Sequence, residues 1–593
     1  MTGTVEPGNT GRRVAAAALA ALVAVALAAT ARAAVPPSAG DILVTAIPRP
    51  VVDTTHGYVE YRFTVRNTSS EHTHRVTVAL PGHADYSGGL LGRVSRTALV
   101  GPNTEKTLSL VQLPLYMAGV DATVYVDGEK GEGVRLSIPS HGLGYHHADP
   151  DEIKRIILVS RGAPRVSHLF HSERFNLMAA RNDVRSWSPN WLAYSCCDGI
   201  VVAGGEVDLM PPGVRLALAR YVECGGSLLV MGRPKRPLPL AGGAGPVVAG
   251  GGYAAFGRRL VAPESDSTDA VTRFCGAANE TYHPWEDLSD VLRAHERFPV
   301  VESINVPVRG MLALMLVFVI VIGPVNILVL ARKRRRIWLF VTVPAASLVT
   351  CGLVFGYSIF SEGIRGRYRT LSLTVLDENV GRATTIGWTA FYSPLTPRSG
   401  LHFSLQTELT PQIYDYRDFV YSYRRPQDSG VHRTVSLAED QHLAAGWVRA
   451  RVPVAFKFRR SEDRRERLTV RRDAGGPVRV VNGLGVPVRR LVLADEQGAL
   501  HEAADVAPGA EATLASRQGR PHGQAFRTIY TRGWLGAARD LRRTPETYLR
   551  PGMYVAFLEE SPFAEKALAG AVAQRSEAIV LGISKRSDDA RSR

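Results

Sequence analysis

The chain has 593 residues, more than one hydrophobic core accommodates, so we expect about three or four domains of roughly 100 to 200 residues each. Its 45% hydrophobic and 21% charged residues are typical of folded protein and do not indicate a multi-spanning channel. The formal net charge of +16 comes from arginines spread along the chain. A basic surface attracts anionic polymers and lipid headgroups, but no nucleic-acid-binding module is present, so we expect no nucleic-acid partner.

The first 33 residues have the order of a secretory signal peptide. Arg12 and Arg13 precede an apolar stretch over 14–29, and Ala31-Arg32-Ala33 then provides a small-x-small cleavage site. We predict a signal peptide over 1–33, with a retained membrane anchor as the alternative.

Residues 41–140 carry the pattern of short strands. Between Val59 and Arg66 apolar and polar residues alternate, which is typical of a strand with one buried face. Similar segments recur with turn residues such as Asp127-Gly128 between them. This spacing predicts an immunoglobulin-like β-sandwich.

Residues 152–300 alternate between strand and helix patterns. Buried-type strands are predicted at 156–159, 199–202 and 228–231, and helices at about 166–181 and 211–223. Such alternation predicts a parallel sheet covered by helices on its faces.

Two segments of this α/β region, Asp198 to Gly205 and Tyr221 to Gly232, resemble the class I glutamine amidotransferase-like fold. In active members of that family the second strand leads into a Gly-x-Cys-x-Gly nucleophile elbow, and a His-x-Glu pair follows. Here the elbow position reads Gly232-Arg233-Pro234, and Cys224 precedes the strand. The resemblance implies a flavodoxin-like domain without the catalytic cysteine.

Such a domain retains a cleft after its central strands, so ligand binding is expected near Gly204 and Gly205. The candidate ligand-binding residues are Gly204, Gly205, Glu206, Asp208 and His283. The segment from His283 to Glu286 is similar to the family's histidine and glutamate pair, although it also suits the start of a helix. No catalytic residue is predicted.

Two long apolar stretches in the middle of the chain predict a membrane hairpin. We place transmembrane helices at 309–331 and 337–360, each with the roughly 20 residues that cross a hydrocarbon core. The connecting loop 332–336 consists of Arg332, Lys333, Arg334, Arg335 and Arg336. Because short loops rich in Lys and Arg stay in the cytoplasm, both flanking regions are predicted to be exported.

Several residues inside this hairpin bear on helix packing. Pro324 and Pro344 each remove a backbone donor and are expected to break or kink their helices. Asn326 is expected to form an interhelical hydrogen bond, with a polar pathway as the alternative. Gly352 and Gly356 form a small-xxx-small pair that predicts close packing of the two helices.

After the hairpin, residues 366–583 repeat β-type patterns and are interpreted as an exported β-rich region. The charged end, 584–593, is predicted to be disordered. The overall fold class is therefore multidomain α+β.

Four of the five cysteines, Cys196, Cys197, Cys224 and Cys275, fall in the α/β region. In an oxidising compartment they predict at least one disulfide, with three pairings open; the alternative is four small buried residues. Their spacing fits no zinc site, and the histidines near 141–147 suit a polar linker better than a metal site. No metal or cofactor is predicted.

Taken together, the order of segments resembles a group of bacterial membrane proteins that has no agreed biochemical activity. We predict a non-catalytic, membrane-anchored scaffold or binding protein of the cell envelope, whose partners are the lipid bilayer and an envelope protein, glycan or polymer. One alternative is an exported hydrolase that acts on glycan or peptide through the α/β cleft. Another is an accessory subunit of a membrane transport or signalling complex.

Overall fold

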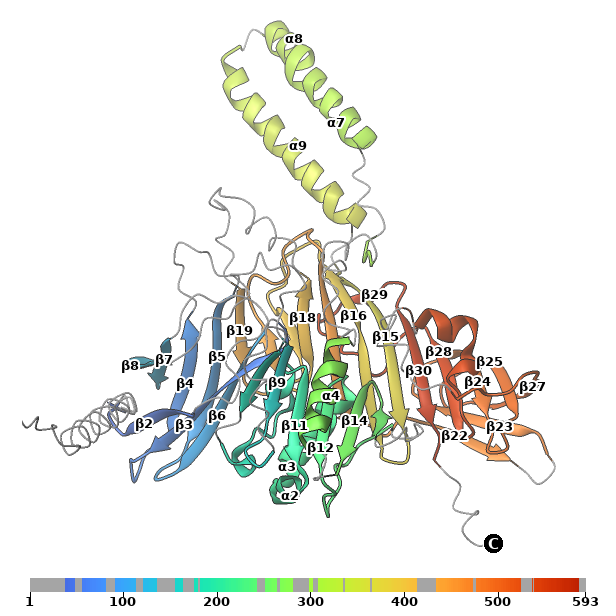
Figure 1. Cartoon of the computed structure of the whole chain (residues 1–593). Coiled ribbons are helices and arrows are strands. Elements are labelled where there is room, and N and C mark those ends of the chain that lie inside the picture. Colours follow the sequence, from blue (N-terminus) through green and yellow to red (C-terminus); the bar gives the residue numbers. More distant parts are fainter. Residues whose placement is uncertain are drawn as a thin grey trace, which may run out of the picture.

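The computed structural model describes residues 38–47, 56–81, 91–113, 121–135, 155–163, 175–179, 182–242, 251–263, 267–280, 298–301, 308–333, 336–362, 365–412, 433–472, 476–523, 536 and 538–585. The predicted signal peptide lies outside these residues. The described chain is mixed α+β and rich in strands (Figure 1). Its strands form five sheets, from which one helical hairpin projects.

The N-terminal strands form part of two facing sheets. One has the order β1-β2-β3-β6, from β1 (Ser38–Ala39), β2 (Ile42–Ile47), β3 (Val59–Asn67) and β6 (Glu105–Gln112). The other contains β4 (His74–Pro81), β5 (Leu91–Val100), β7 (Asp121–Val126) and β8 (Glu129–Arg135). The alternation predicted in β3 is confirmed, since Tyr61, Phe63 and Val65 are buried between the sheets.

The second of these sheets is completed by strands that follow the hairpin in sequence. β5 pairs in parallel with β19 (Arg433–Leu437), and β20 (Gln441–Leu443) and β17 (Leu401–Phe403) extend the sheet. The strand order is β17-β20-β19-β5-β4-β7-β8. Segments that the sequence suggested were separate units, 41–140 and 366–583, therefore share one hydrogen-bonded sheet.

The α/β unit has the strand order β10-β9-β11-β12-β14-β13, parallel except for β13. Its strands are β9 (Arg155–Val159), β10 (Phe175–Ala179), β11 (Gly199–Ala203), β12 (Ser227–Met231), β13 (Gly251–Ala254) and β14 (Gly257–Ala262). Helix α3 (Pro212–Glu223) packs on one face and α4 (Ser267–Glu280) on the other, and the short α2 (Gly204–Leu209) follows β11.

One secondary-structure prediction in this unit is wrong. The helix expected over 166–181 is contradicted at 175–179, where β10 pairs with β9 along its whole length. A short apolar run such as Phe175–Ala179 is compatible with a helix or a strand. As a strand, it pairs with the backbone N–H and C=O groups on the outer edge of β9, which would otherwise lack partners. The helix predicted at 211–223 is confirmed as α3.

The largest sheet belongs to the C-terminal half and has the order β18-β21-β16-β15-β30-β28-β24-β25-β27, with β29 beside β15. Its strands are β15 (Arg367–Asp377), β16 (Arg382–Tyr392), β18 (Glu408–Gln412), β21 (Val454–Asp463), β24 (Val488–Ala494), β25 (Leu500–Val506), β27 (Ala515–Arg517), β28 (Met553–Leu558), β29 (Val572–Ala573) and β30 (Glu577–Ile583). A smaller sheet of β22 (Arg467–Arg472), β23 (Val478–Gly483) and β26 (Glu511–Thr513) packs against part of it.

The same strand arrangement occurs at both ends of the molecule. The neighbours β2-β3-β6 and β5-β4-β7 of the N-terminal unit correspond in order to β22-β23-β26 and β25-β24-β28 of the C-terminal unit. Asn67 is the last residue of β3 and Asn482 is the last but one of the matching strand β23, and both are buried. The amide of Asn67 donates to the carbonyls of His72, Val100 and Gly101, at 2.8, 3.1 and 3.0 Å.

Asn482 makes the equivalent contacts, because its amide donates to the carbonyls of Val486, Val506 and Ala507 at 2.9, 3.0 and 3.2 Å. In each unit the side-chain oxygen also accepts from the backbone two residues later. One buried asparagine thus joins three carbonyls in each unit, of which those of Gly101 and Ala507 also accept from Thr104 and Ala510, respectively.

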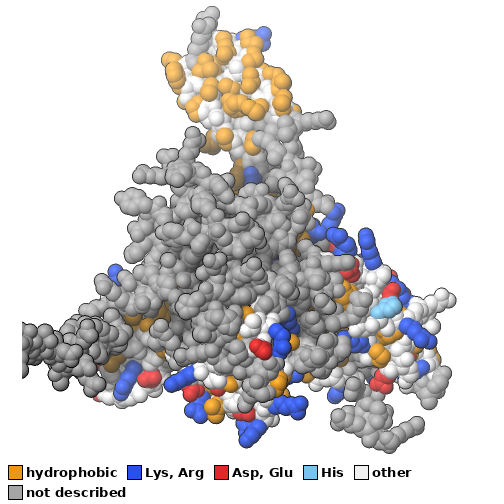
Figure 2. Space-filling model, in the orientation of Figure 1, with side chains coloured by type: hydrophobic (Ala, Val, Ile, Leu, Met, Phe, Trp, Pro, Cys, Tyr) orange, Lys and Arg blue, Asp and Glu red, His pale blue; other side chains and the backbone are white. Residues whose placement is uncertain are grey.

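The projecting hairpin consists of α7 (Val308–Ile320), a π-helical turn (Val321–Val325), α8 (Asn326–Arg332), a short 3₁₀ turn (Arg336–Trp338) and α9 (Leu339–Glu362). Two stretches, Met315–Arg332 and Leu339–Gly356, are long and apolar enough to span a membrane. Figure 2 shows that apolar side chains cover the hairpin surface. Pro324 lies in the π-helical turn, so the predicted break in this helix is confirmed.

For the other hairpin residues, the structure agrees only in part with the predicted packing. Pro344 lies within α9, which continues as one α-helix through it. A Cβ added at Gly352 or Gly356 meets no described atom of the partner helix within 4 Å. These glycines lie one turn apart and are exposed, so the close packing predicted at them is not seen in the described part of the hairpin.

Candidate functional site

The carboxyl edge of the parallel sheet is the candidate ligand-binding site. The chain order of the strands reverses between β9 and β11, because β10 lies on one side of β9 and β11 on the other. Open α/β sheets bind ligands outside the carboxyl ends of the strands at such a reversal. Here those ends lead into Ser160 to Gly162 after β9 and into α2 after β11.

Glu206 of α2 lies at this reversal and is bonded to the loop after β9. Its carboxylate accepts hydrogen bonds from the hydroxyl of Ser160 and from the backbone N–H of Gly162, the latter at 2.9 Å. The hydroxyl of Ser160 also accepts from the N–H of Ala203, at 3.3 Å. A Cβ on Gly162 would lie 2.8 Å from Cδ of Glu206, so the loop fits closely over this carboxylate.

Asp208 faces a different loop. Its carboxylate accepts from the backbone N–H groups of Lys235 and Arg236, at 3.0 and 2.8 Å. These two hydrogen bonds lower the pKa of Asp208. The carboxylates of Glu206 and Asp208 are thus engaged with the loops after β9 and β12, respectively, and stabilise both connections at this edge.

The remaining candidates differ in accessibility. Gly204 is buried, and a Cβ there would lie 3.0 Å from the carbonyl oxygen of Met231, so glycine allows α2 to approach the end of β12. Gly205 is exposed, with open space beside it, and Leu209 one turn later is 48% exposed. His283 lies outside the described residues. Gly205 and Leu209 therefore form an exposed face of α2 at the candidate site.

The elbow position after β12 carries no thiol. Gly232 adopts a positive φ of 87° there, and its N–H donates to the carbonyl of Ala262 at 2.7 Å. Cys224 instead caps the end of α3, before β12, as its sequence position indicated. It is buried, and burial raises its pKa well above the usual thiol value, which suppresses the reactive thiolate.

All four cysteines of this unit are free in the structure, so it does not contain the disulfide that the sequence predicted. Cys275 lies in the core between the sheet and α4, while Cys196, Cys197 and Cys224 lie in the core on the opposite face. The sheet therefore separates Cys275 from the other three. Within the described ranges no group of three or more His, Cys, Asp or Glu residues has the arrangement of a metal site.

A buried ionic cluster that the sequence did not reveal joins the α/β unit to the largest sheet. Glu223, at the end of α3, is fully buried. Its carboxylate accepts from Nη1 of Arg382 at 2.8 Å, from the hydroxyl of Ser461 at 2.5 Å and from the N–H of Ala241 at 2.7 Å. Burial raises the pKa of Glu223, an effect that the charge of Arg382 opposes. The charge is tolerated here because it is paired.

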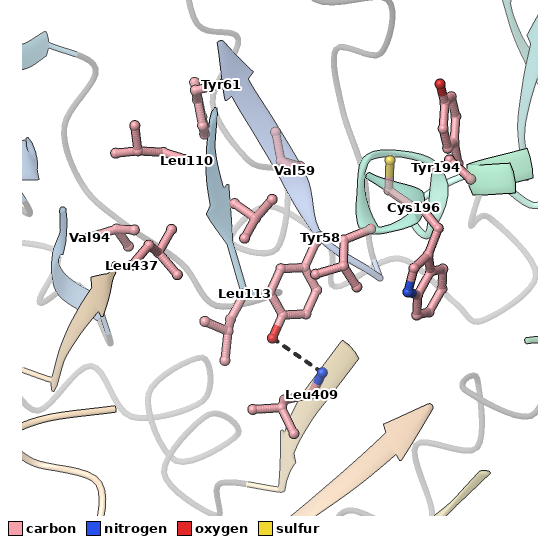
Figure 3. Close-up of a cluster of buried hydrophobic side chains, with 14 of the residues drawn as sticks. Tyr58, Val59, Tyr61, Val94, Leu110, Leu113, Tyr194, Cys196, Leu409 and Leu437 are labelled. Carbon is pink, nitrogen blue, oxygen red and sulfur yellow. Dashed lines mark hydrogen bonds between the residues drawn. The ribbon is translucent and has the colours of Figure 1, made fainter. Parts of the chain in front are cut away.

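The same interface continues through an aromatic contact. Tyr58 comes from the N-terminal region, and its hydroxyl donates to Oε1 of Gln441 at 2.9 Å and accepts from the N–H of Leu409 at 3.2 Å. Its backbone N–H donates to the hydroxyl of Ser195 in the α/β unit at 2.8 Å. Figure 3 shows side chains from all three regions meeting around Tyr58 in one core.

Both ends of the hairpin are attached to the largest sheet. Phe298, ten residues before α7, packs edge-to-face on Trp388 of β16 with ring centroids 5.9 Å apart. Arg369 of β15 lies over the Phe298 ring at 4.7 Å and donates to the carbonyl of Pro299 at 2.9 Å. The chain segments that enter and leave the hairpin are therefore clamped together at β15 and β16.

Within the hairpin, the side-chain amide of Asn326 donates to the hydroxyl of Thr342 on α9 at 2.9 Å. This contact is the interhelical hydrogen bond expected from the sequence.

Comparison with protein-family models and with curated protein sequences gave no match to this chain.

Proposed function

We propose that the protein is a non-catalytic scaffold or binding protein of the cell envelope, anchored in the membrane by its two-pass hairpin. The observation that carries this proposal is the pairing of β5 with β19, because one strand precedes the hairpin and the other follows it. Strands on opposite sides of a bilayer cannot pair. If the hairpin spans a membrane, the two flanking regions therefore share one side.

The side is inferred from charge. Arg332 is the last residue of α8, Lys333 caps this helix and Arg336 begins the turn before α9, so these three cations lie at the tip of the hairpin, far from the folded body (Figure 1). The positive-inside rule favours a cytoplasmic tip and hence an exported body. The predicted signal peptide favours the same orientation.

We further infer that the N-terminal unit is an immunoglobulin-like sandwich and that the α/β unit is a flavodoxin-like, non-catalytic relative of the amidotransferases. The strand order around β9 and β11 supports the second assignment. The absence of a thiol at Gly232 to Pro234 and the burial of Cys224 support a non-catalytic role.

The engaged carboxylates count against the hydrolase alternative. A general acid or base must reach a substrate proton, whereas Glu206 and Asp208 already accept two hydrogen bonds each from neighbouring loops. The exposed Gly205 and Leu209 face of α2 suits contact with a partner surface better than chemistry.

One observation favours the second alternative, an accessory subunit of a membrane complex. The contacts of Arg369 with Phe298 and Pro299 fix the segment that precedes the hairpin against the β15 and β16 pair. A membrane partner that displaces this segment would therefore act on the folded body.

Crosslinking in intact cells tests the scaffold proposal. We expect an impermeant crosslinker to join the full-length protein to an envelope protein, glycan or polymer, and we expect Gly205→Phe to abolish this product. Gly252→Phe is the matched control, because Gly252 also has open space beside it and lies on the far strand β13 of the same sheet. Absence of any crosslinked envelope component with the wild-type protein would contradict the proposal.

A further inference from the structure

The end of the largest sheet from which the hairpin leaves carries exposed apolar and cationic side chains. We define the membrane-proximal rim as Arg365, Leu395, Arg398, Arg451, Val452 and Val572. Leu395, Val452 and Val572 are 45%, 43% and 43% exposed, respectively, and the three arginines are also exposed.

Strand register brings these residues to one edge. Arg367 at the start of β15 pairs with Tyr392 at the end of β16 and with Val572 of β29. Phe391 of β16 pairs with Val454 at the start of β21. The segments just beyond these strand ends, which contain Arg365, Leu395 and Val452, therefore project past the same edge of the sheet.

Backbone hydrogen bonds hold these segments against one another. The N–H of Arg451 donates to the carbonyl of Ser393 at 2.8 Å, and the N–H of Val572 donates to the carbonyl of Gly366 at 2.9 Å. The N–H of Ala450 also donates to the hydroxyl of Thr396, at 3.2 Å. The rim is thus a structured surface formed by three adjoining segments of the chain.

The hairpin keeps this rim close to the bilayer. Helix α9 has 24 residues and is about 36 Å long, at about 1.5 Å per residue, which is slightly more than a hydrocarbon core of about 30 Å. It ends at Glu362, and the connection to Arg367 reaches at most about 18 Å, at about 3.5 Å per residue. When the hairpin spans the membrane, the start of β15 consequently lies within about 24 Å of the hydrocarbon core.

From these observations we propose that the rim is a lipid-contacting surface, which inserts Leu395, Val452 and Val572 among the headgroups and binds anionic lipid with its arginines. Apolar side chains beside Lys or Arg are the features of surfaces that bind anionic membranes. Two acidic residues close to this edge, Glu560 and Glu577, are paired with Lys566 and Arg542, respectively. This inference rests on the proposed membrane anchoring.

Fluorophores on single introduced cysteines test it in the full-length protein with Cys351→Ser, reconstituted in nanodiscs whose lipids carry a quencher on the headgroup. The four remaining cysteines are buried and are not expected to label in the folded state. The rim probe is Val452→Cys. The control is Val380→Cys, which is 46% exposed but lies beyond the opposite end of β15, about 35 Å away at about 3.3 Å per residue. Phe340→Cys in the hairpin reports on anchoring itself.

We expect several-fold stronger quenching at Val452 than at Val380, and a further increase when phosphatidylglycerol replaces part of the phosphatidylcholine. The double substitution Arg365→Glu and Arg398→Glu should remove that increase. Equal quenching at Val452 and Val380, with Phe340 quenched, would overturn the rim proposal and leave the anchoring intact. An unquenched probe at Phe340 would overturn the anchoring, and the rim proposal with it.

Discussion

The buried pair of Glu223 and Arg382 should contribute more to the cohesion of the molecule than any surface ion pair. Glu223→Ala removes the acceptor of three buried hydrogen bonds and leaves Arg382 at the interface with Asp463 and the carbonyl of Pro239 as partners. Loss of one partner of a buried pair costs about 3–5 kcal/mol. That is a large fraction of the roughly 5–15 kcal/mol that stabilises a typical domain.

Hydrogen exchange in β21 is the appropriate assay, because this strand carries Ser461 and lies against the α/β unit, and because local opening is measured without assuming two-state unfolding. We expect Glu223→Ala to lower the free energy of opening by about 3–5 kcal/mol. Adding Arg382→Met should recover part of the loss, since the double variant leaves no unpaired charge.

The matched control is Glu511→Ala, which breaks an exposed pair with Arg479 whose two side chains are each 38% exposed. Exposed pairs contribute about 0–1 kcal/mol. If Glu223→Ala cost no more than this control, the interface would not depend on the buried cluster and the reasoning would fail.

Three further predictions address other parts of the molecule. Asn67→Ala and Asn482→Ala should each destabilise their own β unit by about 2 kcal/mol in denaturant unfolding, because each removes a buried amide that donates to three carbonyls. A neutral effect of either substitution would show that water replaces the amide. Asp208 has a lowered pKa, so its stabilising contribution should be present above about pH 4, its unfolded value, and disappear as the pH falls through the lower folded value. The denaturation midpoints of wild type and Asp208→Asn should therefore differ at neutral pH and converge in acid, and a difference that grows in acid would contradict this sign. Asn326→Val should weaken the association of the hairpin helices in a bilayer by about 0.6–2 kcal/mol, measured by steric trapping, because it removes the hydrogen bond to Thr342. A more stable hairpin in this variant would mean that the hydrogen bond does not form in the bilayer.

Local patterns allowed much of the secondary structure to be predicted. The alternation in β3, the apolar face of α3 and the two apolar stretches of the hairpin each correspond to an element of the structure. These features depend on residues close together in sequence, where side-chain periodicity reports directly on the buried face.

Long-range pairing was not predictable from such patterns. Nothing in Arg433–Leu437 indicates that this segment pairs with β5, more than 300 residues earlier. In the sequence Glu223 is an ordinary acidic residue at a helix end, and only the tertiary fold places Arg382 and Ser461 beside it. Glu206 and Asp208 follow β11 in the sequence, but their partners are backbone groups of distant loops, to which composition gives no clue.

One signal in the sequence could have been used. The correspondence of the two β units is visible in short segments that lead into β6 and β26, where the same residues recur at the same spacing: Val100, Pro102, Glu105, Thr107 and Leu108 match Val506, Pro508, Glu511, Thr513 and Leu514. Searching for internal repeats before assigning domains would have indicated that the two ends of the chain form similar units.

Cysteine labelling in intact cells tests the central claim most directly, that an apolar hairpin anchors one folded body assembled from both flanking regions. In a Cys351→Ser background, an impermeant thiol reagent should label Val380→Cys in the body and should label Lys333→Cys at the hairpin tip only after the cells are permeabilised. Labelling of Lys333→Cys in intact cells, with Val380→Cys protected, would contradict the proposed orientation.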